Sequence, residues 1–335
     1  MSGGRVRGLA AAATAAALLA LGCAGLAPGP GEAPPDPALP ARARVEGVPF
    51  FPQREDQCGP AALAMVLAWG GLAVDPETLR PWVYTESLRG SLQPALTAAA
   101  RRAGRIAVPL AGREALEREI AAGHPVIVLQ NLGLEWVPLW HYAVVIGYDR
   151  ERDELFLHSG TEADRRVAGE LFRRSWRRAG DWGLVVLPPG RLPATAGEAA
   201  MLEALAALER AGRPEAALSG YRALLARFPQ SLPALLGLGN SAFAAGDLPL
   251  AEGALLQAVR LHPEAAVAFN NLAHVRIACG RPEAALPAAR RAVALGGPHR
   301  AVFLRTLAEA LAALPQAPET AAEDSEKIVD EPQCN

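Results

Sequence analysis

Three side chains in this sequence have the types and the contexts of a nucleophilic site. Cys58 opens an apolar run over 58–69 that ends at two glycines and predicts a buried helix with the thiol at its N-terminus. The positive end of a helix favours a thiolate, and the imidazole of His141 can serve as its base and later protonate a leaving amine. The amide of Gln53 and the backbone N–H of Cys58 can donate to the oxyanion of a tetrahedral intermediate. A buried structural cysteine is the alternative interpretation of the same helix.

The elements that must position these residues are expected in one mixed α+β domain over 45–190. Helices are predicted to begin at Pro76 and to cover 91–102, 113–122 and 167–178, from capping residues and apolar spacing. Apolar runs predict strands at 105–110, 125–129, 140–148 and 182–187, with a hairpin partner at 154–158. His141 then lies at the start of a strand, far in sequence from Cys58.

Composition narrows the functional classes. The chain has 335 residues, enough for two domains of ordinary size, and 51% of them are hydrophobic. Its formal net charge of −2 gives no strong positive electrostatic field that would indicate binding to nucleic acid. The four cysteines form no CxxC pair, and a Cys279–Cys334 bridge is conceivable without any feature that favours it. The six histidines do not cluster with cysteines or acids, so we expect neither a metal nor an organic cofactor.

The N-terminus predicts export. Residues 1–23 have two arginines, an apolar stretch too short to span a bilayer, and an end at Cys23 that resembles a bacterial lipobox. That resemblance implies lipidation of the Cys23 thiol and attachment to the cell envelope, with Ala24 favouring the periplasmic face of the outer membrane. A plain cleaved signal with an incidental cysteine is the alternative. Residues 24–44, rich in Pro, Ala and Gly, are expected to form an extended tether.

A repeat governs the second half of the chain. Gly212, Gly246 and Gly280 recur at 34 residues within an Ala- and Leu-rich region over 196–315. This period resembles the tetratricopeptide family and predicts an all-α solenoid of three repeats and a final helix at 299–313. The resemblance implies a groove that binds a peptide or protein partner, and a spacer or dimerisation element is the alternative. The acidic tail over 316–335 is expected to be disordered.

The first half also resembles a known family. The segments 48–53, 57–67 and 141–149 are similar to the bacteriocin-processing, double-glycine-leader cysteine peptidases. The resemblance implies a papain-like fold with Cys58 as nucleophile, His141 as general base and acid, and Gln53 as oxyanion donor. Gln57 is the less suitable donor because it adjoins the nucleophile.

One position departs from that family. An Asp usually orients the histidine from the end of the next strand, and Ser159 stands there instead. Ser159 can hydrogen-bond the imidazole weakly, or the site works as a dyad, with Asp149 and Asp164 as more distant candidates. We expect Trp136, Trp140 and Trp182 to lie in the core or in a cleft wall. The arginines at 165–166 and 173–178 are expected to form a solvated helix face, and binding to anionic lipid headgroups is the alternative.

The sequence therefore predicts a membrane-tethered cysteine peptidase acting on a peptide or protein substrate, with repeats that recruit substrate or partner. An acyl transferase using the same Cys58 and His141 is a close chemical alternative. A non-catalytic envelope scaffold that binds proteins through its repeats is the alternative from another class.

Overall fold

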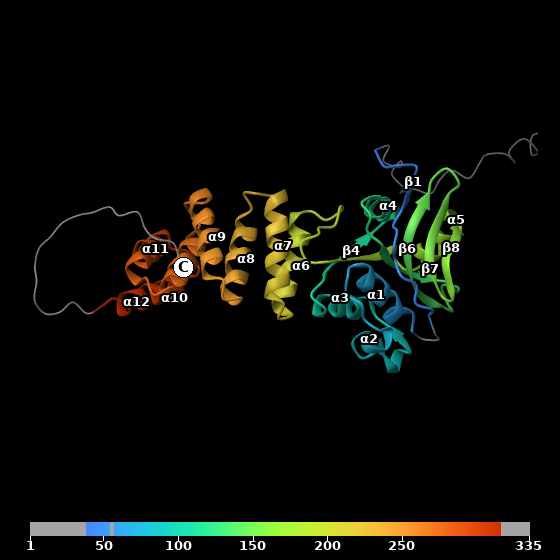
Figure 1. Cartoon of the computed structure of the whole chain (residues 1–335), viewed down its shortest axis with the longest axis horizontal. Helices are drawn as coiled ribbons and strands as arrows, with labels where there is room; N and C mark the ends of the chain where they lie inside the picture. The colour runs from blue at the N-terminus through green and yellow to red at the C-terminus, as the bar shows by residue number, and fades with distance from the viewer. Residues whose placement is uncertain (1–37, 54–56, 316–335) are drawn as a thin grey trace, which may run out of the picture. The chain divides into compact units, whose positions relative to one another are not determined.

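The computed structural model describes residues 38–53 and 57–315, in which a sheet-based region precedes a helical one (Figure 1). The predicted signal segment with Cys23, most of the tether and the acidic tail lie outside the described residues. The described residues between Leu39 and residue 315 belong to one compact unit. No helix in the described part is long and apolar enough to cross a membrane.

A single antiparallel sheet organises the first region, in the order β4-β9-β5-β6-β7-β8, with β1 beside β6. Its strands are β1 (Arg42–Arg44), β4 (Ile106–Ala111), β5 (Val126–Asn131), β6 (Trp140–Asp149), β7 (Glu154–Ser159), β8 (Glu162–Ala168) and β9 (Trp182–Leu187). The helices are α1 (Cys58–Trp69), α2 (Pro76–Val83), α3 (Gln93–Arg102), α4 (Arg113–Ala121) and α5 (Gly169–Arg177). A small hairpin of β2 (Tyr84–Thr85) and β3 (Gly90–Ser91) lies between α2 and α3.

Both faces of the sheet are covered, which explains the continuous apolar runs of its strands. Side chains alternate along β6: Tyr142 and Val144 face one cluster with α1, α2 and α3, whereas Ala143 and Val145 face another with α4 and α5. Helix α1 is buried over nine consecutive residues, 59–67, because it lies between the sheet and the other helices of its layer. Cys58 at its N-terminus and Trp69 at its C-terminus are both half-buried.

Three segments differ from expectation. The helix predicted from residue 91 begins at Gln93, because Gly90–Ser91 is strand β3. Residues 162–168 form the edge strand β8, so the helix predicted from 167 begins at Gly169. Six of the seven β8 residues are exposed, and an edge strand open on both faces has no apolar alternation to mark it. The last residues of the predicted tether also belong to the fold, since Arg42–Arg44 pairs with β6 and Tyr148 donates to the Pro40 carbonyl at 3.0 Å.

The second region has three pairs of helices followed by a final helix, as the 34-residue period predicts. They are α6 (Glu198–Arg210), α7 (Pro214–Arg227), α8 (Leu232–Ala244), α9 (Leu248–Leu261), α10 (Ala266–Ala278), α11 (Pro282–Leu295) and α12 (Arg300–Ala312). Gly212, Gly246 and Gly280 have φ of +70°, +81° and +71° in the turn within each pair, a conformation that glycine adopts without strain. The α+β region followed by an all-α repeat confirms the predicted fold class.

The two regions share hydrophobic packing. One cluster of buried side chains includes Ile106 and Leu187 from the sheet together with Leu205 from α6 and Tyr221 from α7. Arg213 also donates from Nε to the Arg102 carbonyl at 2.8 Å. The boundary predicted at residue 190 therefore divides two architectures that have a common core.

Candidate active site

Cys58 is the first residue of α1, is half-buried and is not in a disulfide. Its charge as a thiolate acts on Tyr142 of β6: burial raises the pKa of the Tyr142 hydroxyl, and Cys58 raises it further. The thiol therefore lies within electrostatic reach of the strand that carries His141.

Gly59 permits a close approach at this helix end. A Cβ at Gly59 would overlap the side chain of Ser91 in β3. The Tyr142 hydroxyl donates to the Ser91 carbonyl at 3.1 Å, so β3 is held over the start of α1 from the sheet side as well. The residue after Cys58 must accordingly be small.

The amide of Gln53 connects the parts of the site. Its Nε2 donates to the Tyr142 carbonyl at 3.0 Å and lies 3.5 Å from the Cys58 carbonyl. Its Oε1 accepts the Gly160 N–H at 2.8 Å, and its own backbone N–H donates to the Gly160 carbonyl at 2.9 Å. A single buried side chain thus joins the start of α1, the start of β6 and the β7–β8 turn.

His141 is half-buried at the second position of β6, and its Nε2 lies 2.9 Å from Ser159 Oγ. Ser159 is 6% exposed and ends β7, the place where the sequence predicts it. The two acidic candidates are engaged elsewhere: Asp149 pairs with Arg42 at 2.9 Å and Asp164 with Arg44 at 2.6 Å. With Nε2 on Ser159, Nδ1 is the ring nitrogen that can serve a nucleophile.

The surroundings of His141 disfavour its charged form. Burial lowers the pKa of the imidazole, and the guanidinium of Arg165 on β8 lowers it further. Sequence reasoning missed Arg165, because its position depends on the register of an edge strand and on a bulge between Leu157 and Ser159. A neutral His141 imidazole can act as a general base, whereas a preformed ion pair with the Cys58 thiolate would need the charged imidazolium.

Other predicted or excluded residues have separate environments. Gln57 donates to Glu77 at 2.8 Å, away from β6, whereas Gln53 makes all the contacts described above. His158 is buried, with its Nε2 3.0 Å from the Val48 carbonyl and its Nδ1 accepting the Asp164 N–H at 3.1 Å, which is a structural arrangement. Cys279 is disulfide-bonded. No cluster in the described residues has the three or more His, Cys, Asp or Glu side chains that a metal ion would need.

This arrangement is suited to acyl transfer from an amide: it has a thiol at a helix start, a neutral imidazole at a strand start, and a glutamine amide between their backbones. The comparison with protein families agrees. Residues 45–183 match the Peptidase_C39 like family. This C39-like domain contains Gln53, Cys58, His141 and Ser159.

Solved structures resemble each region, and no curated protein matches the chain. A protein described as a C39-like peptidase from Bacillus anthracis is 22% identical, with 44% of this chain and 97% of that chain covered and a TM-score of 0.38. A double glycine motif protease from an AMS/PCAT transporter, in complex with the leader peptide, is 25% identical over 43% of this chain and 93% of its own, with a TM-score of 0.35. The first TPR of Spaghetti (RPAP3), bound to the HSP90 peptide SRMEEVD, is 20% identical over 33% and 90%, with a TM-score of 0.31.

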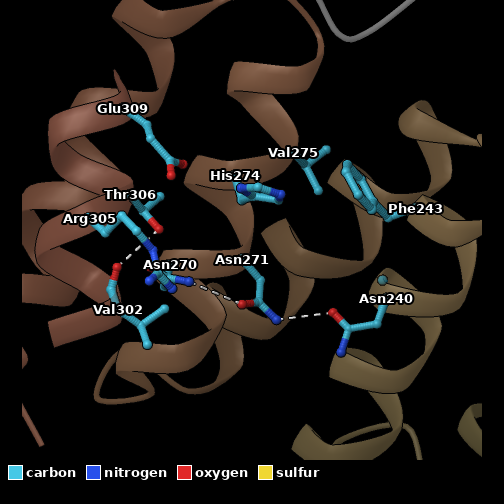
Figure 2. Close-up of a pocket in the computed structure, with 11 residues that line it drawn as sticks. Asn240, Phe243, Asn270, Asn271, His274, Val275, Val302, Arg305, Thr306 and Glu309 are labelled. Carbon is cyan, nitrogen blue, oxygen red and sulfur yellow. Dashed lines mark hydrogen bonds between the residues drawn. The ribbon is translucent and has the colours of Figure 1, made fainter. Parts of the chain in front are cut away.

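The repeats contain a second candidate site, a hollow of about 400 Å³ lined by α8, α10 and α12 (Figure 2). Asn270 donates from Nδ2 to Asn271 Oδ1 at 3.4 Å, and Asn271 donates onward to Asn240 Oδ1 at 3.0 Å. Asn270 is 8% exposed, and its Oδ1 has no hydrogen-bond partner in the described part of the chain. Arg305 and Glu309 on α12 line the same hollow and supply one charge of each sign.

Proposed function

We propose that this chain is an exported, membrane-tethered cysteine peptidase that hydrolyses peptide bonds through a thioester on Cys58. The observation that supports it most directly is the position of Gln53, whose amide lies between the Cys58 and Tyr142 carbonyls inside a segment that matches a peptidase family. His141 is the base in this proposal; it lies at the start of β6, with its Nε2 within hydrogen-bond distance of Ser159 Oγ.

In the proposed mechanism, Nδ1 of His141 takes the thiol proton while the Cys58 sulfur attacks the carbonyl carbon of the scissile bond. The Nε2 hydrogen of Gln53 that makes the long 3.5 Å contact with the Cys58 carbonyl turns to the oxyanion, which the Cys58 backbone N–H also stabilises. The C–N bond breaks as His141 returns the proton to the leaving amine, which leaves an acyl thioester. Water, deprotonated by His141, then attacks the thioester, and the departing sulfur takes the proton back.

Tethering and recruitment complete the proposal. Lipidation of Cys23 would hold the protein at the periplasmic face of the outer membrane, with the following residues as a spacer. The hollow between α8, α10 and α12 would bind an extended polypeptide, because the unpartnered Oδ1 of Asn270 needs a donor such as a peptide N–H. That polypeptide is either the substrate or a protein that delivers it.

Two other functions have specific support. Acyl transfer differs only in the attacking group, an amine in place of water, and uses the same four residues. A non-catalytic scaffold is favoured by the environment of His141, which has a serine where the resembled family has a carboxylate and an arginine nearby.

The rate of Cys58 alkylation against pH separates catalysis from scaffolding. We expect alkylation near neutral pH to be faster than that of an ordinary thiol of pKa about 8.5, and to fall at least about tenfold in His141→Ala. Mass spectrometry of the Cys58 peptide isolates this thiol from the other cysteines. His274→Ala, a change of the same kind in the repeats, should leave the rate unchanged. Ordinary titration of Cys58 that is indifferent to His141→Ala would reject the peptidase.

A further inference from the structure

The connection between β5 and β6 is a short hairpin that exposes large apolar side chains. Residues 131–140, the apolar hairpin, extend the β5–β6 ladder with hydrogen bonds from Leu132 N to Leu139 O at 2.8 Å and from Leu134 N to Val137 O at 3.1 Å. Its exposed side chains are Leu132 (47%), Leu134 (53%), Trp136 (77%), Val137 (63%), Leu139 (61%) and Trp140 (52%). The sequence predicts Trp136 and Trp140 in the core or in a cleft wall, and their exposure shows that they do not lie in the core.

The hairpin projects because its neighbouring strands stop short of it. Strand β9 pairs with β5 only over 126–128, and β7 pairs with β6 only over 144–149. Leu139 and Trp140 are adjacent, so they point to opposite faces, yet each is more than half exposed. Both faces of the hairpin are open, which makes it a convex apolar projection and not the wall of a groove.

Four backbone donors of the hairpin, those of Leu132, Gly133, Leu134 and Leu139, are satisfied internally. Asn131 Oδ1 accepts the N–H groups of Gly133 and Leu139, each at 3.0 Å, and its Nδ2 donates to the Leu134 carbonyl at 3.3 Å. Pro138 has no N–H to satisfy, and a Cβ on Gly133 would overlap the Val137 carbonyl. These four donors keep their partners when the hairpin enters an apolar phase, and they are not available to an added strand.

Positive charge lies at the base of the hairpin. Arg178, directly after α5, donates from Nε and NH2 to the Asn131 carbonyl at 3.2 and 2.8 Å. Arg177 in the last turn of α5 is exposed, and the exposed Arg174 pairs with Glu170 at 2.7 Å. The only acid within 131–140 is Glu135, at the tip. An apolar tip with guanidinium groups behind it matches the two layers of an anionic membrane surface.

We propose that the apolar hairpin docks this protein on an anionic phospholipid bilayer. The two tryptophans and the leucines enter the interfacial region, where amphipathic rings are favoured, and the arginines at the end of α5 meet the phosphates. Insertion is shallow, so the carboxylate of Glu135 stays hydrated among the headgroups. A bilayer needs no complementary pocket, which is why a convex, two-faced projection favours it over a second copy or a polypeptide.

Docking at this point has a consequence for the active site. Trp140 directly precedes His141, so a docked hairpin holds the start of β6 at the membrane surface. Substrates near the membrane would then be favoured. The docking itself requires neither a catalytic Cys58 nor a lipid on Cys23.

Vesicle sedimentation tests the proposal with the chain from Leu39 onward, which contains the compact unit and lacks the apolar N-terminal segment. The probes are vesicles of phosphatidylcholine alone and of phosphatidylcholine with an equal part of phosphatidylglycerol. We expect binding to the anionic vesicles, at least about tenfold weaker binding for Leu134→Ser/Trp136→Ser, and stronger binding for Glu135→Gln. Leu304→Ser/Leu311→Ser removes two comparably exposed leucines from α12 and should bind as the unchanged protein does.

Several results would overturn it. One is an unchanged protein that stays in the supernatant with both vesicles, and another is equal sedimentation of the two double variants. Equal binding to neutral and anionic vesicles would reject the role of the arginines. A concentration-dependent dimer that the hairpin variant abolishes, in the absence of vesicle binding, would assign the hairpin to a second copy. Because Trp136 is 77% exposed, Trp136→Ser alone should fold and is the fallback variant if the double variant does not.

Discussion

At the scale of single residues, the environment of His141 decides how the site can work. Arg165 on β8 and burial both lower the pKa of the imidazole. Arg165→Gln removes the charge, so the pKa should rise toward the ordinary histidine value near 6.5. The acid limb of Cys58 alkylation should move to higher pH with it, because the neutral base is then lost sooner on acidification. Titration of the His141 ring signal by NMR measures the change.

Arg166→Gln is the matched control for this prediction. Arg166 is next to Arg165 in the same strand but stacks over the Phe156 ring, 5.7 Å from its centroid. It should leave the pKa of His141 where it is. Equal shifts from the two substitutions would mean that general surface charge, and not Arg165, governs the imidazole.

Ser159 gives a second residue-scale prediction, in the same direction as Arg165. Ser159→Asp places a carboxylate beside Nε2 of His141 and should raise the pKa of the imidazole. The neutral base is then lost sooner on acidification, so the acid limb of Cys58 alkylation should move to higher pH, as it should in Arg165→Gln. Ser159→Asn keeps a polar partner without the charge and should shift neither quantity. A carboxylate without effect would show that Ser159 does not govern His141 in solution.

At the scale of elements, Gln53 holds α1, β6 and the β7–β8 turn together. Gln53→Glu keeps an acceptor for the Gly160 N–H but cannot donate to the Tyr142 carbonyl, which it leaves buried without its donor. The free energy of unfolding should fall by about 1–3 kcal/mol, and Cys58 alkylation should slow. Chemical denaturation measures the first effect. Gln57→Ala removes an exposed contact with Glu77 and should change stability by about 0.5 kcal/mol or less.

Which parts of the structure could be predicted from the sequence also depends on the helices and strands that contain them. The helix that begins at Cys58 and the strand that carries His141 could be predicted because continuous apolar runs mark them. The paired helices could be predicted from the 34-residue repeat of Gly212, Gly246 and Gly280. Strand β8 could not, since its exposed edge has no apolar face, and Arg165 was missed along with it. The exposure of Trp136 and Trp140 in the apolar hairpin was not predicted, for a related reason. Large apolar side chains are typical of a core, and the exposure of these two depends on where β7 and β9 end.

The segment that connects the two regions is held by a buried carboxylate on α4. Glu119 is fully buried; it accepts from Thr195 N at 2.8 Å and from Ala194 N at 3.2 Å, and His124 Nδ1 lies 2.7 Å away. Burial alone would raise the pKa of Glu119, but the hydrogen bonds from His124 and Thr195 outweigh it and lower the pKa below the ordinary 4.5. Glu119 is therefore bound as a carboxylate that ties the connecting segment to the sheet region.

This arrangement predicts acid lability. A lowered folded pKa stabilises the protein above the unfolded value, and this contribution is lost as the pH falls below about 4.5. Glu119→Gln should lower the free energy of unfolding by about 2 kcal/mol at neutral pH and should flatten its decline in acid. Glu114→Gln removes an exposed acid from the same helix and should do neither. Thermal melts between neutral and acidic pH would contradict the assignment if the two variants decline in parallel.

At the scale of the whole molecule, the shared hydrophobic cluster predicts that the first repeat and the sheet region unfold together. Leu205 of α6 is fully buried in the cluster that contains Ile106 and Leu187. Leu255 of α9 is equally buried, but in a cluster formed by the later repeats. The same substitution at these two sites therefore tests where one cooperative unit ends and the next begins.

The chain supplies separate probes for this test. All six tryptophans lie between residues 69 and 182, so their fluorescence reports on the sheet region, whereas helical circular dichroism is dominated by the repeats. Leu205→Ala should lower stability by about 2–5 kcal/mol and shift the transitions seen by both probes, because its cavity opens in the common core. Leu255→Ala should shift the dichroism transition and leave the fluorescence transition in place. If Leu205→Ala leaves tryptophan fluorescence unmoved, the sheet region is stable on its own and the repeats are only attached to it. A coupled response would instead mean that strain on the first repeat, such as a bound partner exerts, reaches the sheet that positions His141.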